Sequence, residues 1–282
     1  MTEPPFPLAR ILCEHSPSHR IIDAGALLVG GSQGYARLLS HEMSRVIGFE
    51  PIVNECADLN RRFGPTHLYL PYALGDGRIG TFHRCNEPVT SSLLAPDLGL
   101  MAHFQNLPEF CRVVEQSTIK TVRLDDIPEA RGADFFKIDT QGAELQILEN
   151  SRECLHTILA IQTEVEFLPI YRHQPLFGDV DAFLRSEGFL FHKFVDFEGR
   201  VLRDVPIPDL PATRSQVLWA DAVYIRSIDQ WDALVPEDLL KLAAILHELY
   251  SSLDFCVRLL SIFDQKKGTA LAPAYVHLIS NR

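Results

Sequence analysis

The sequence predicts an α/β fold in which a mostly parallel sheet carries helices on both faces and an antiparallel strand at one edge. Two strand–loop–helix units carry the prediction: in each, a short apolar segment ends in an acid, a glycine-containing turn follows, and helical periodicity then begins. Ligands of open α/β folds bind in the crevice at the carboxyl ends of the strands. The acids at those ends are therefore the first candidates for a functional site.

The clearest unit, DFFKIDTQGAELQILEN, runs from Asp134 to Asn150. Its phenylalanines and Ile138 predict a buried strand that stops at Asp139, and the turn at Gly142 leads into a helix. This order places the Asp139 carboxylate at the carboxyl edge of the sheet. Two interpretations of this carboxylate stay open: it binds a ligand, or it caps the following helix.

An N-terminal unit repeats the pattern. Residues 20–26, RIIDAGA, predict a strand that ends near Asp23 and Gly25, and helical periodicity resumes over 35–44 after a glycine-rich loop. The next segment, RVIGFEP, predicts a second strand that ends at Glu50. A glycine-rich first turn with an acid at the end of the second strand is typical of nucleoside-binding domains, in which that acid accepts hydrogen bonds from ribose hydroxyls.

The spacing of glycines in the first loop distinguishes between nucleoside cofactors. Dinucleotides need a G-x-G-x-x-G turn, whereas here Gly25 is followed next by Gly30. Acids such as Asp23 and Asp139 would repel a pyrophosphate, but they attract the sulfonium and ammonium cations of S-adenosylmethionine. The residues therefore favour a sulfonium cofactor over NAD. The alternative for Asp23 is a structural role in holding loop backbone.

Seven segments together resemble the FkbM-like methyltransferases. In chain order they read IIDAGA, VIGFEP, YALGDG, TSSLL, VRLDDI, DFFKIDTQGAEL and WADAVYIR, and they extend over residues 20–226. The resemblance, most specific in KIDTQGAEL, implies a class I, Rossmann-like fold and S-adenosylmethionine-dependent methylation of hydroxyl oxygens, often on sugars or polyketides. The family usually has Asn after its Gly-Ala and another Gly two positions later. Here Leu27 follows Ala26, and the first loop is longer.

The strand ends and the resemblance together define a predicted cofactor site. Its residues are Asp23, Gly25, Ala26, Glu50, Pro51, Ala73, Ser92 and Asp139. Ser91 and Ser92 have two interpretations: they hydrogen-bond the cofactor carboxylate or the substrate, or they shape a turn.

Methyl transfer to a hydroxyl requires positioning and usually a general base, because an alkyl hydroxyl is a poor nucleophile until it loses its proton. The fifth predicted strand, Leu155–Phe167, ends in TEVEF. Strand alternation places Glu164 and Glu166 on one face, near Asp139. These three acids are the predicted catalytic residues. Facing acids raise one another's pKa, whereas the alternative is a solvated or helix-capping pair.

Two further polar residues near this edge have open roles. Lys137 lies inside the predicted strand, where it either forms an ion pair below the sheet edge or orients Asp139 or Glu164. No ligand spacing predicts a metal site, although a divalent ion held by these acids or by His173 is an alternative.

Composition limits the partners and the compartment. The 282-residue chain, 46% hydrophobic, can bury one sizeable core, and its net charge of −11 argues against nucleic acid or an anionic membrane as the main partner. No stretch approaches the roughly 20 apolar residues of a membrane span, and the N-terminus lacks the long apolar run of a signal peptide. Six scattered cysteines without a C-x-x-C pair predict buried thiols in a reducing cytoplasm.

Two units are predicted along the chain: a Rossmann-like domain over 1–226 and a helical extension over 227–282. Residues 95–115 are poorly periodic and predict a mobile flap. In the extension, one helix is predicted from Pro236 to Tyr250 and a second from Asp254 to Asp264. These helices either pack on the catalytic domain or form the interface of a homodimer.

The sequence thus predicts an S-adenosylmethionine-dependent O-methyltransferase that acts on a hydroxyl of a sugar, glycolipid or polyketide-type acceptor. Two alternatives stay open. One is a nicotinamide-dependent oxidoreductase on a related fold, which the missing dinucleotide glycines disfavour. The other is a non-catalytic module of the same fold, which the irregular loop after Gly25 supports.

Overall fold

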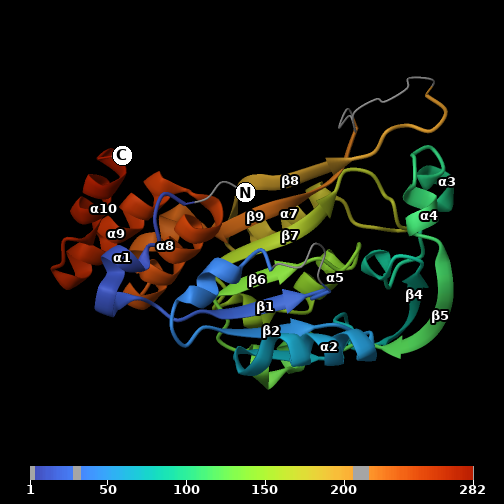
Figure 1. Ribbon diagram of the computed structural model, residues 1–282, viewed down its shortest axis with the longest axis horizontal. Coiled ribbons are helices and arrows are strands. Elements are labelled where there is room, and N and C mark those ends of the chain that lie inside the picture. The colour runs from blue at the N-terminus through green and yellow to red at the C-terminus, as the bar shows by residue number, and fades with distance from the viewer. Residues whose placement is uncertain (1–3, 28–32, 206–215, 282) are drawn as a thin grey trace.

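The computed structural model describes residues 4–27, 33–205 and 216–281, and within them a seven-stranded sheet forms the centre of the molecule (Figure 1). The strand order is β3-β2-β1-β6-β7-β9-β8. All pairs from β3 to β7 are parallel, and β9 runs antiparallel to both of its neighbours. The predicted mixed sheet is confirmed. Its strands are β1 (Arg20–Ala24), β2 (Arg45–Phe49), β3 (His67–Leu70), β6 (Phe135–Ile138), β7 (Ala160–Glu166), β8 (Phe189–Gly199) and β9 (Val217–Arg226).

The five parallel strands follow the doubly wound order 3-2-1-4-5, whose switch point lies between β1 and β6. The register places Ala24 opposite both Phe49 and Ile138. The residues that follow these three strands, Gly25, Glu50 and Asp139, consequently emerge at the same edge of the sheet.

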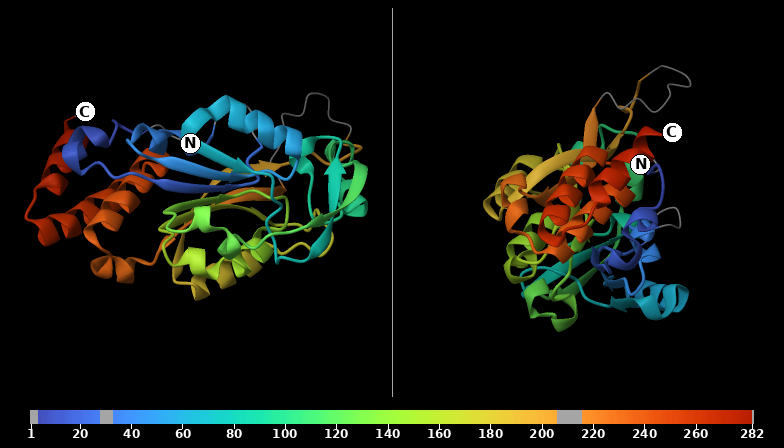
Figure 2. Two further views of the ribbon diagram at one scale, coloured as in Figure 1. Left: turned by 90° about the horizontal axis from the view of Figure 1, so that it is seen from below. Right: turned by 90° about the vertical axis from the view of Figure 1, so that its left-hand side faces the viewer.

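Helices cover both faces of the sheet, as predicted (Figure 2). Strand residues alternate between two cores: Ile22, Phe136 and Ile161 share one with α5 and α7, whereas Ile21 and Phe135 share the other with α8. Helix α2 packs on Tyr69 and Ala26 on the α8 side of the sheet. The helices are α2 (Val53–Phe63), α5 (Glu144–Glu149), α6 (Arg152–Leu155), α7 (Phe177–Ser186) and α8 (Pro236–Tyr250).

The C-terminal helices pack at the amino ends of the parallel strands, at the end of the molecule opposite β4 and β5 (Figure 1). Helix α8 has the predicted bounds, α9 (Leu253–Lys267) is slightly longer than predicted, and α10 (Leu271–Ser280) was not predicted. Side chains of α8 share a core with β1, β6, β7 and β9 and with the short N-terminal helix α1 (Ala9–Leu12). The division of the chain at residue 226 stays a prediction.

Three local predictions are wrong. The strand predicted from Leu155 begins only at Ala160, because helix α6 continues to Leu155. The periodic stretch 35–44 forms only a short 3₁₀ helix, Ala36–Ser40, because His41 is extended and Met43 has a φ of 65°, so the helix cannot continue. Residues 95–115 do not form an irregular flap: they contain α3 (Leu98–Met101), α4 (Leu107–Phe110) and the start of β5 (Val113–Lys120). Strand β5 pairs with β4 (Ile79–Cys85) in a separate antiparallel sheet beside the carboxyl edge of the main sheet.

Within the residues that the structure describes, no helix is both long and apolar enough to cross a bilayer.

Candidate active site

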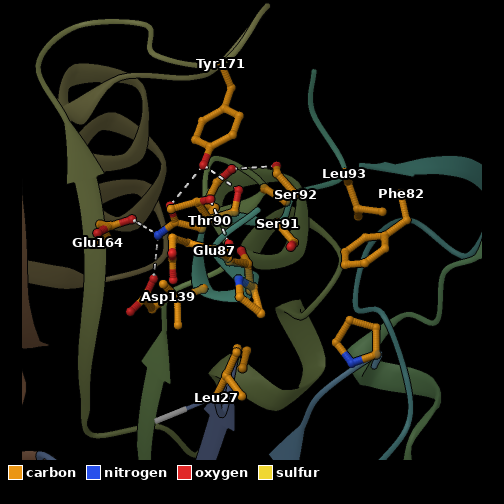
Figure 3. A pocket seen from close by; sticks show the side chains of 18 of the residues that line it. Leu27, Phe82, Glu87, Thr90, Ser91, Ser92, Leu93, Asp139, Glu164 and Tyr171 are labelled. Carbon is orange, nitrogen blue, oxygen red and sulfur yellow. Dashed lines mark hydrogen bonds between the residues drawn. The ribbon is translucent and has the colours of Figure 1, made fainter. Parts of the chain in front are cut away.

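A cavity of about 620 Å³ lies at the carboxyl ends of β1, β2, β6 and β7 (Figure 3). This volume is in the range of roughly 300–1,000 Å³ that is usual for small-molecule sites. The strand ends form one wall, and the segment after β4, helix α4 and the segment after β7 form the other. Six of the eight predicted cofactor residues line it: Gly25, Glu50, Pro51, Ala73, Ser92 and Asp139.

Gly25 is required by the close approach of β1 and β6. Its φ is 77°, and a Cβ atom there would lie 1.8 Å from the carbonyl oxygen of Asp139. The amides of Gly25 and Ala26 both donate to the carbonyl oxygen of Phe49 at 3.1 Å. The turn after β1 is thus fixed to the ends of β2 and β6, and no side chain at Gly25 intrudes into the cavity. Gly30 and Gly31 lie outside the described residues.

Glu50 places a buried carboxylate in the cavity wall at the end of β2. Its Oε1 accepts a hydrogen bond of 2.8 Å from the amide of Ile52, which orients the side chain. Burial raises the pKa of Glu50 to about 7. Hydroxyl groups that donate to this carboxylate would favour its ionised form and lower that pKa.

Asp23 and Ala26 do not line the cavity. Asp23 is buried below the cavity wall, where its Oδ2 accepts a hydrogen bond of 2.7 Å from the hydroxyl of Tyr35. Its Oδ1 lies 3.6 Å from the Lys137 ammonium nitrogen, which is also 3.6 Å from Asp139 Oδ2. Burial raises the pKa of Asp23, and the positive charge of Lys137 opposes this effect. The ion-pair interpretation of Lys137 therefore holds, and the same lysine joins Asp23 to the cavity acid Asp139.

Glu164 and Glu166 point from one face of β7, and only Glu164 lines the cavity. They are 9% and 2% exposed, so they are not the solvated pair of the alternative interpretation. Burial raises the pKa of both side chains well above the usual value, with the charge of Asp139 contributing in each case. Buried Glu144, at the start of α5, adds a fourth acid with a pKa raised to about 7 by burial.

Gln141 joins two of these acids and was not predicted as a site residue. Its Nε2 donates to Asp139 Oδ1 at 3.0 Å and to Glu164 Oε2 at 2.7 Å, as the dashed lines in Figure 3 show. The hydroxyl of Tyr171 lies 3.0 Å from Gln141 Oε1 and 2.8 Å from the carbonyl oxygen of Thr90. The one sequence signal for Gln141 is its position, two residues after the strand-end acid Asp139. The contact with Tyr171 depends on tertiary structure alone.

The serines of the TSSLL segment both hold the loop. Ser92 Oγ donates to the carbonyl oxygen of Gln141 at 2.6 Å and accepts from the amide of Leu94 at 2.9 Å. Ser91 Oγ accepts from the amide of Cys85 at 3.0 Å. Both serines also line the cavity, so the turn-shaping role does not remove them from the site.

The wall opposite the strand ends contains a group of apolar side chains beside its polar residues. Arg200 is the one cationic side chain among the described residues that line the cavity, and its guanidinium stacks 4.8 Å from the ring centroid of Trp219. The apolar side chains of this wall are Phe82, Val89, Leu93, Leu107, Phe110, Ile170 and Trp219.

Across residues 4–27, 33–205 and 216–281, no group of three histidine, cysteine or acidic side chains is placed to hold a metal ion.

Comparison with family models identifies the family of the chain. The family model described as "Methyltransferase FkbM domain" matches residues 23–191, more than half of the chain. No curated protein matches. Solved structures with a similar fold include the magnesium protoporphyrin IX methyltransferase of Synechocystis PCC 6803 with bound SAM, at 11% identity and a TM-score of 0.36, over 78% of this chain and 76% of that one.

Two further solved structures are similar at the same level. One is a putative methyltransferase from Thermoplasma acidophilum, at 10% identity and a TM-score of 0.38, over 77% of this chain and 72% of that one. The other is the precorrin-6y C5,15-methyltransferase of Geobacter metallireducens GS-15, at 13% identity and a TM-score of 0.35, over 78% and 88%. These likenesses are too distant to carry an argument about the acceptor. On its family match, the chain belongs to the FkbM methyltransferase domain family and is an S-adenosylmethionine-dependent methyltransferase.

Proposed function

We propose that this methyltransferase transfers a methyl group to a hydroxyl oxygen of a largely apolar, polyketide-type or lipid-linked acceptor. One observation carries the proposal: a single cavity joins six of the predicted cofactor residues to two carboxylates that Gln141 bridges, buried Glu164 and partly exposed Asp139, and to apolar side chains on the opposite wall. Two possibilities compete with this proposal. The acceptor atom could be nitrogen or carbon, and the acceptor could be a free sugar.

The residues at the ends of β1 and β2 fit S-adenosylmethionine. Gly25 lines the cavity at the β1 turn, and the Glu50 carboxylate is available to ribose hydroxyls in the cavity wall. The Asp139 carboxylate in the cavity attracts the sulfonium and ammonium groups of the cofactor. When bound, the cofactor supplies an electrophilic methyl group on sulfur.

Glu164 is the proposed general base. It lines the cavity, and its raised pKa brings its basicity closer to that of an effective base at neutral pH. In its ionised form it accepts the proton of the acceptor hydroxyl and leaves the oxygen nucleophilic. Asp139 is held beside it by Gln141 and is the second candidate. Glu166, two positions further along β7, was predicted with Glu164 but does not line the cavity.

The apolar side chains of the opposite wall favour an acceptor that is mostly hydrocarbon around its hydroxyl. Phe82, Phe110 and Trp219 present aromatic surface to the cavity, and burial of such surface favours apolar ligands by roughly 25 cal/mol per Å². A free sugar would place some of its hydroxyls against these apolar side chains, where they find no hydrogen-bond partner, and this costs free energy. A glycolipid or a polyketide avoids that cost.

The test is a labelled-methyl transfer screen against hydroxylated polyketides, glycolipids and free sugars, with the Glu164→Gln variant as the control. We expect labelled ether products from apolar acceptors and no transfer to the same acceptors with the hydroxyl already methylated. Label on nitrogen or carbon, or transfer to free sugars alone, would overturn the proposal. Loss of activity with EDTA and its recovery with magnesium would add a metal to the mechanism.

The two other predicted functions can be tested without an acceptor. Family membership gives no support to the nicotinamide-dependent alternative. We expect S-adenosylhomocysteine, and not NAD, to raise the melting temperature.

All six cysteines are free, which supports the proposed cytoplasmic location.

A further inference from the structure

The strongest unassigned feature of the cavity is the side chain of Gln141, whose one amide group contacts both candidate bases. Its nitrogen donates to Asp139 and Glu164, and its oxygen faces the Tyr171 hydroxyl. An amide nitrogen has two hydrogens, one for each carboxylate. The two carboxylates and the Tyr171 hydroxyl, whose one hydrogen is shared with the Thr90 carbonyl oxygen, together favour the amide orientation with the nitrogen toward the acids.

The backbone at Gln141 is built to present this side chain. Its φ is 59°, in the left-handed region that few residues other than glycine adopt, and Gly142 follows with a φ of 103°. Strained conformations of this kind persist where the surrounding structure holds them, and they concentrate at functional sites. The Gln141 carbonyl oxygen also accepts from Ser92 Oγ at 2.6 Å, which fixes the turn to the opposite wall of the cavity.

The negative charges around Glu164 make the hydrogen bond from Gln141 important for its ionised form. Burial is the largest cause that raises the pKa of Glu164, and four acids add to it: Asp139 at the end of β6, Glu166 on β7, Glu144 on α5 and Asp221 on β9. Lys137 on β6 is the positive group that faces this cluster. Without a donor to Glu164, its ionised form would lose its hydrogen-bond stabilisation while the repulsion remained.

We propose that Gln141 is a positioning residue that holds the Asp139 and Glu164 carboxylates side by side and stabilises the ionised, base-competent form of Glu164. Tyr171 is its partner, because the tyrosine helps to keep the amide nitrogen toward the acids. The inference rests on the proposed role of Glu164 as the base. It predicts that removal of the Gln141 N–H donor displaces the titration of Glu164 to higher pH.

The test compares Gln141→Met, which keeps the length of the side chain but removes its N–H groups, with Gln146→Met on the exposed surface of α5 as the matched control. With an acceptor from the screen, the acidic limb of the kcat/KM profile should move up by about one pH unit or more, so that activity falls about tenfold at neutral pH and recovers at alkaline pH. Gln141→Glu should move it further, since it replaces the donor by another acid. Tyr171→Phe should move it less, and Gln146→Met not at all.

A second readout does not depend on activity. Side-chain carboxyl titration by NMR on glutamate-labelled protein, with the Glu164 signal assigned from its loss in Glu164→Gln, should show a higher midpoint in Gln141→Met and in Tyr171→Phe than in the wild type. An unmoved midpoint, or a uniform loss of activity at all pH values, would overturn the inference. A moved midpoint in a protein that methylates no hydroxyl acceptor would instead overturn only the proposed function.

Discussion

Glu164 and Glu166 differ by two positions in one strand, but their surroundings predict different effects of the same substitution. Glu164 lines the cavity, and Glu166 does not. Glu164→Gln should lower the transfer rate by about 10²-fold or more, because the amide cannot accept the acceptor proton. Affinity for S-adenosylhomocysteine should change little. Single-turnover kinetics and titration calorimetry measure the two effects separately.

Glu166→Gln is the internal comparison for that experiment, and its main effect should be on stability. The folded-state pKa of Glu166 is raised, so this group stabilises the fold below its unfolded pKa and loses that contribution as pH rises through the folded value. The glutamine variant should therefore melt at a higher temperature than wild type at alkaline pH, with a transfer rate within a few-fold of wild type. A rate loss equal to that of Glu164→Gln would move the base to Glu166.

Glu50 predicts a pH dependence of cofactor binding. Burial raises its pKa to about 7, and a ribose hydroxyl donates best to the ionised form. S-adenosylhomocysteine affinity should therefore weaken as pH falls below neutrality, and Glu50→Ala should lose about 1–3 kcal/mol of binding free energy at alkaline pH. Calorimetric titrations across pH measure both. Unchanged affinity in the variant would mean that the β2 acid does not contact the cofactor.

The sequence predicts which residues lie at the strand ends of this site, but not which of their side chains face the cavity. Gly25, Glu50 and Asp139 could be placed at one edge because parallel strands end together, and the register of β1, β2 and β6 bears this out. Whether a strand-end acid faces the cavity or lies below it depends on packing, as Asp23 shows with its contact to Tyr35. Tyr171 reaches the site through a tertiary contact that no local pattern encodes.

At the scale of elements, predictability followed the strength of the local signal. Helix α8 has both a proline-led start and a long apolar stripe, and its bounds match the prediction. The short helices α3 and α4 have few turns and no periodic face, and Met101 and Leu107 hold them in a buried cluster that includes Tyr171. Such segments cannot be assigned before their tertiary partners are known.

Helix α8 shares one core with the sheet, so its apolar side chains should contribute to the stability of the catalytic half of the chain. Leu246 is 0% exposed, whereas Val276 on α10 is 40% exposed. Leu246→Ala should lower the free energy of unfolding by about 2–5 kcal/mol, and Val276→Ala should change it little. Urea denaturation followed through both tryptophans measures this, since Trp219 lies on β9 and Trp231 near α9. Separate transitions for the two would support an independent C-terminal unit.

At the scale of the whole molecule, two buried groups of titratable residues lie at opposite ends of the sheet. The acids of the cavity lie at the carboxyl edge, and histidines lie where the N-terminal segment meets α8. There His19 and His41 have ring centroids 5.3 Å apart, and the Leu8 amide donates to Glu248 Oε1 at 2.7 Å. His247 Nε2 lies 2.6 Å from the carbonyl oxygen of Phe6. Stability at low pH should therefore depend on the histidine end.

His19 provides the sharpest test of that expectation. Burial lowers its pKa well below the usual value, with the positive forms of His41 and Lys241 adding to the effect, and neither ring nitrogen has a hydrogen-bond partner in the described part of the chain. A histidine whose folded pKa is lowered contributes stability above its unfolded pKa, about 6.5, and loses it as pH falls below that value. His19→Leu keeps the buried volume similar and removes the titration. The free energy of unfolding of this variant should fall less than that of wild type between neutral and mildly acidic pH, with little change at neutral pH, as urea denaturation at both pH values would measure. Parallel losses in the two proteins would place the acid sensitivity outside His19, with His41→Leu as the next variant to compare.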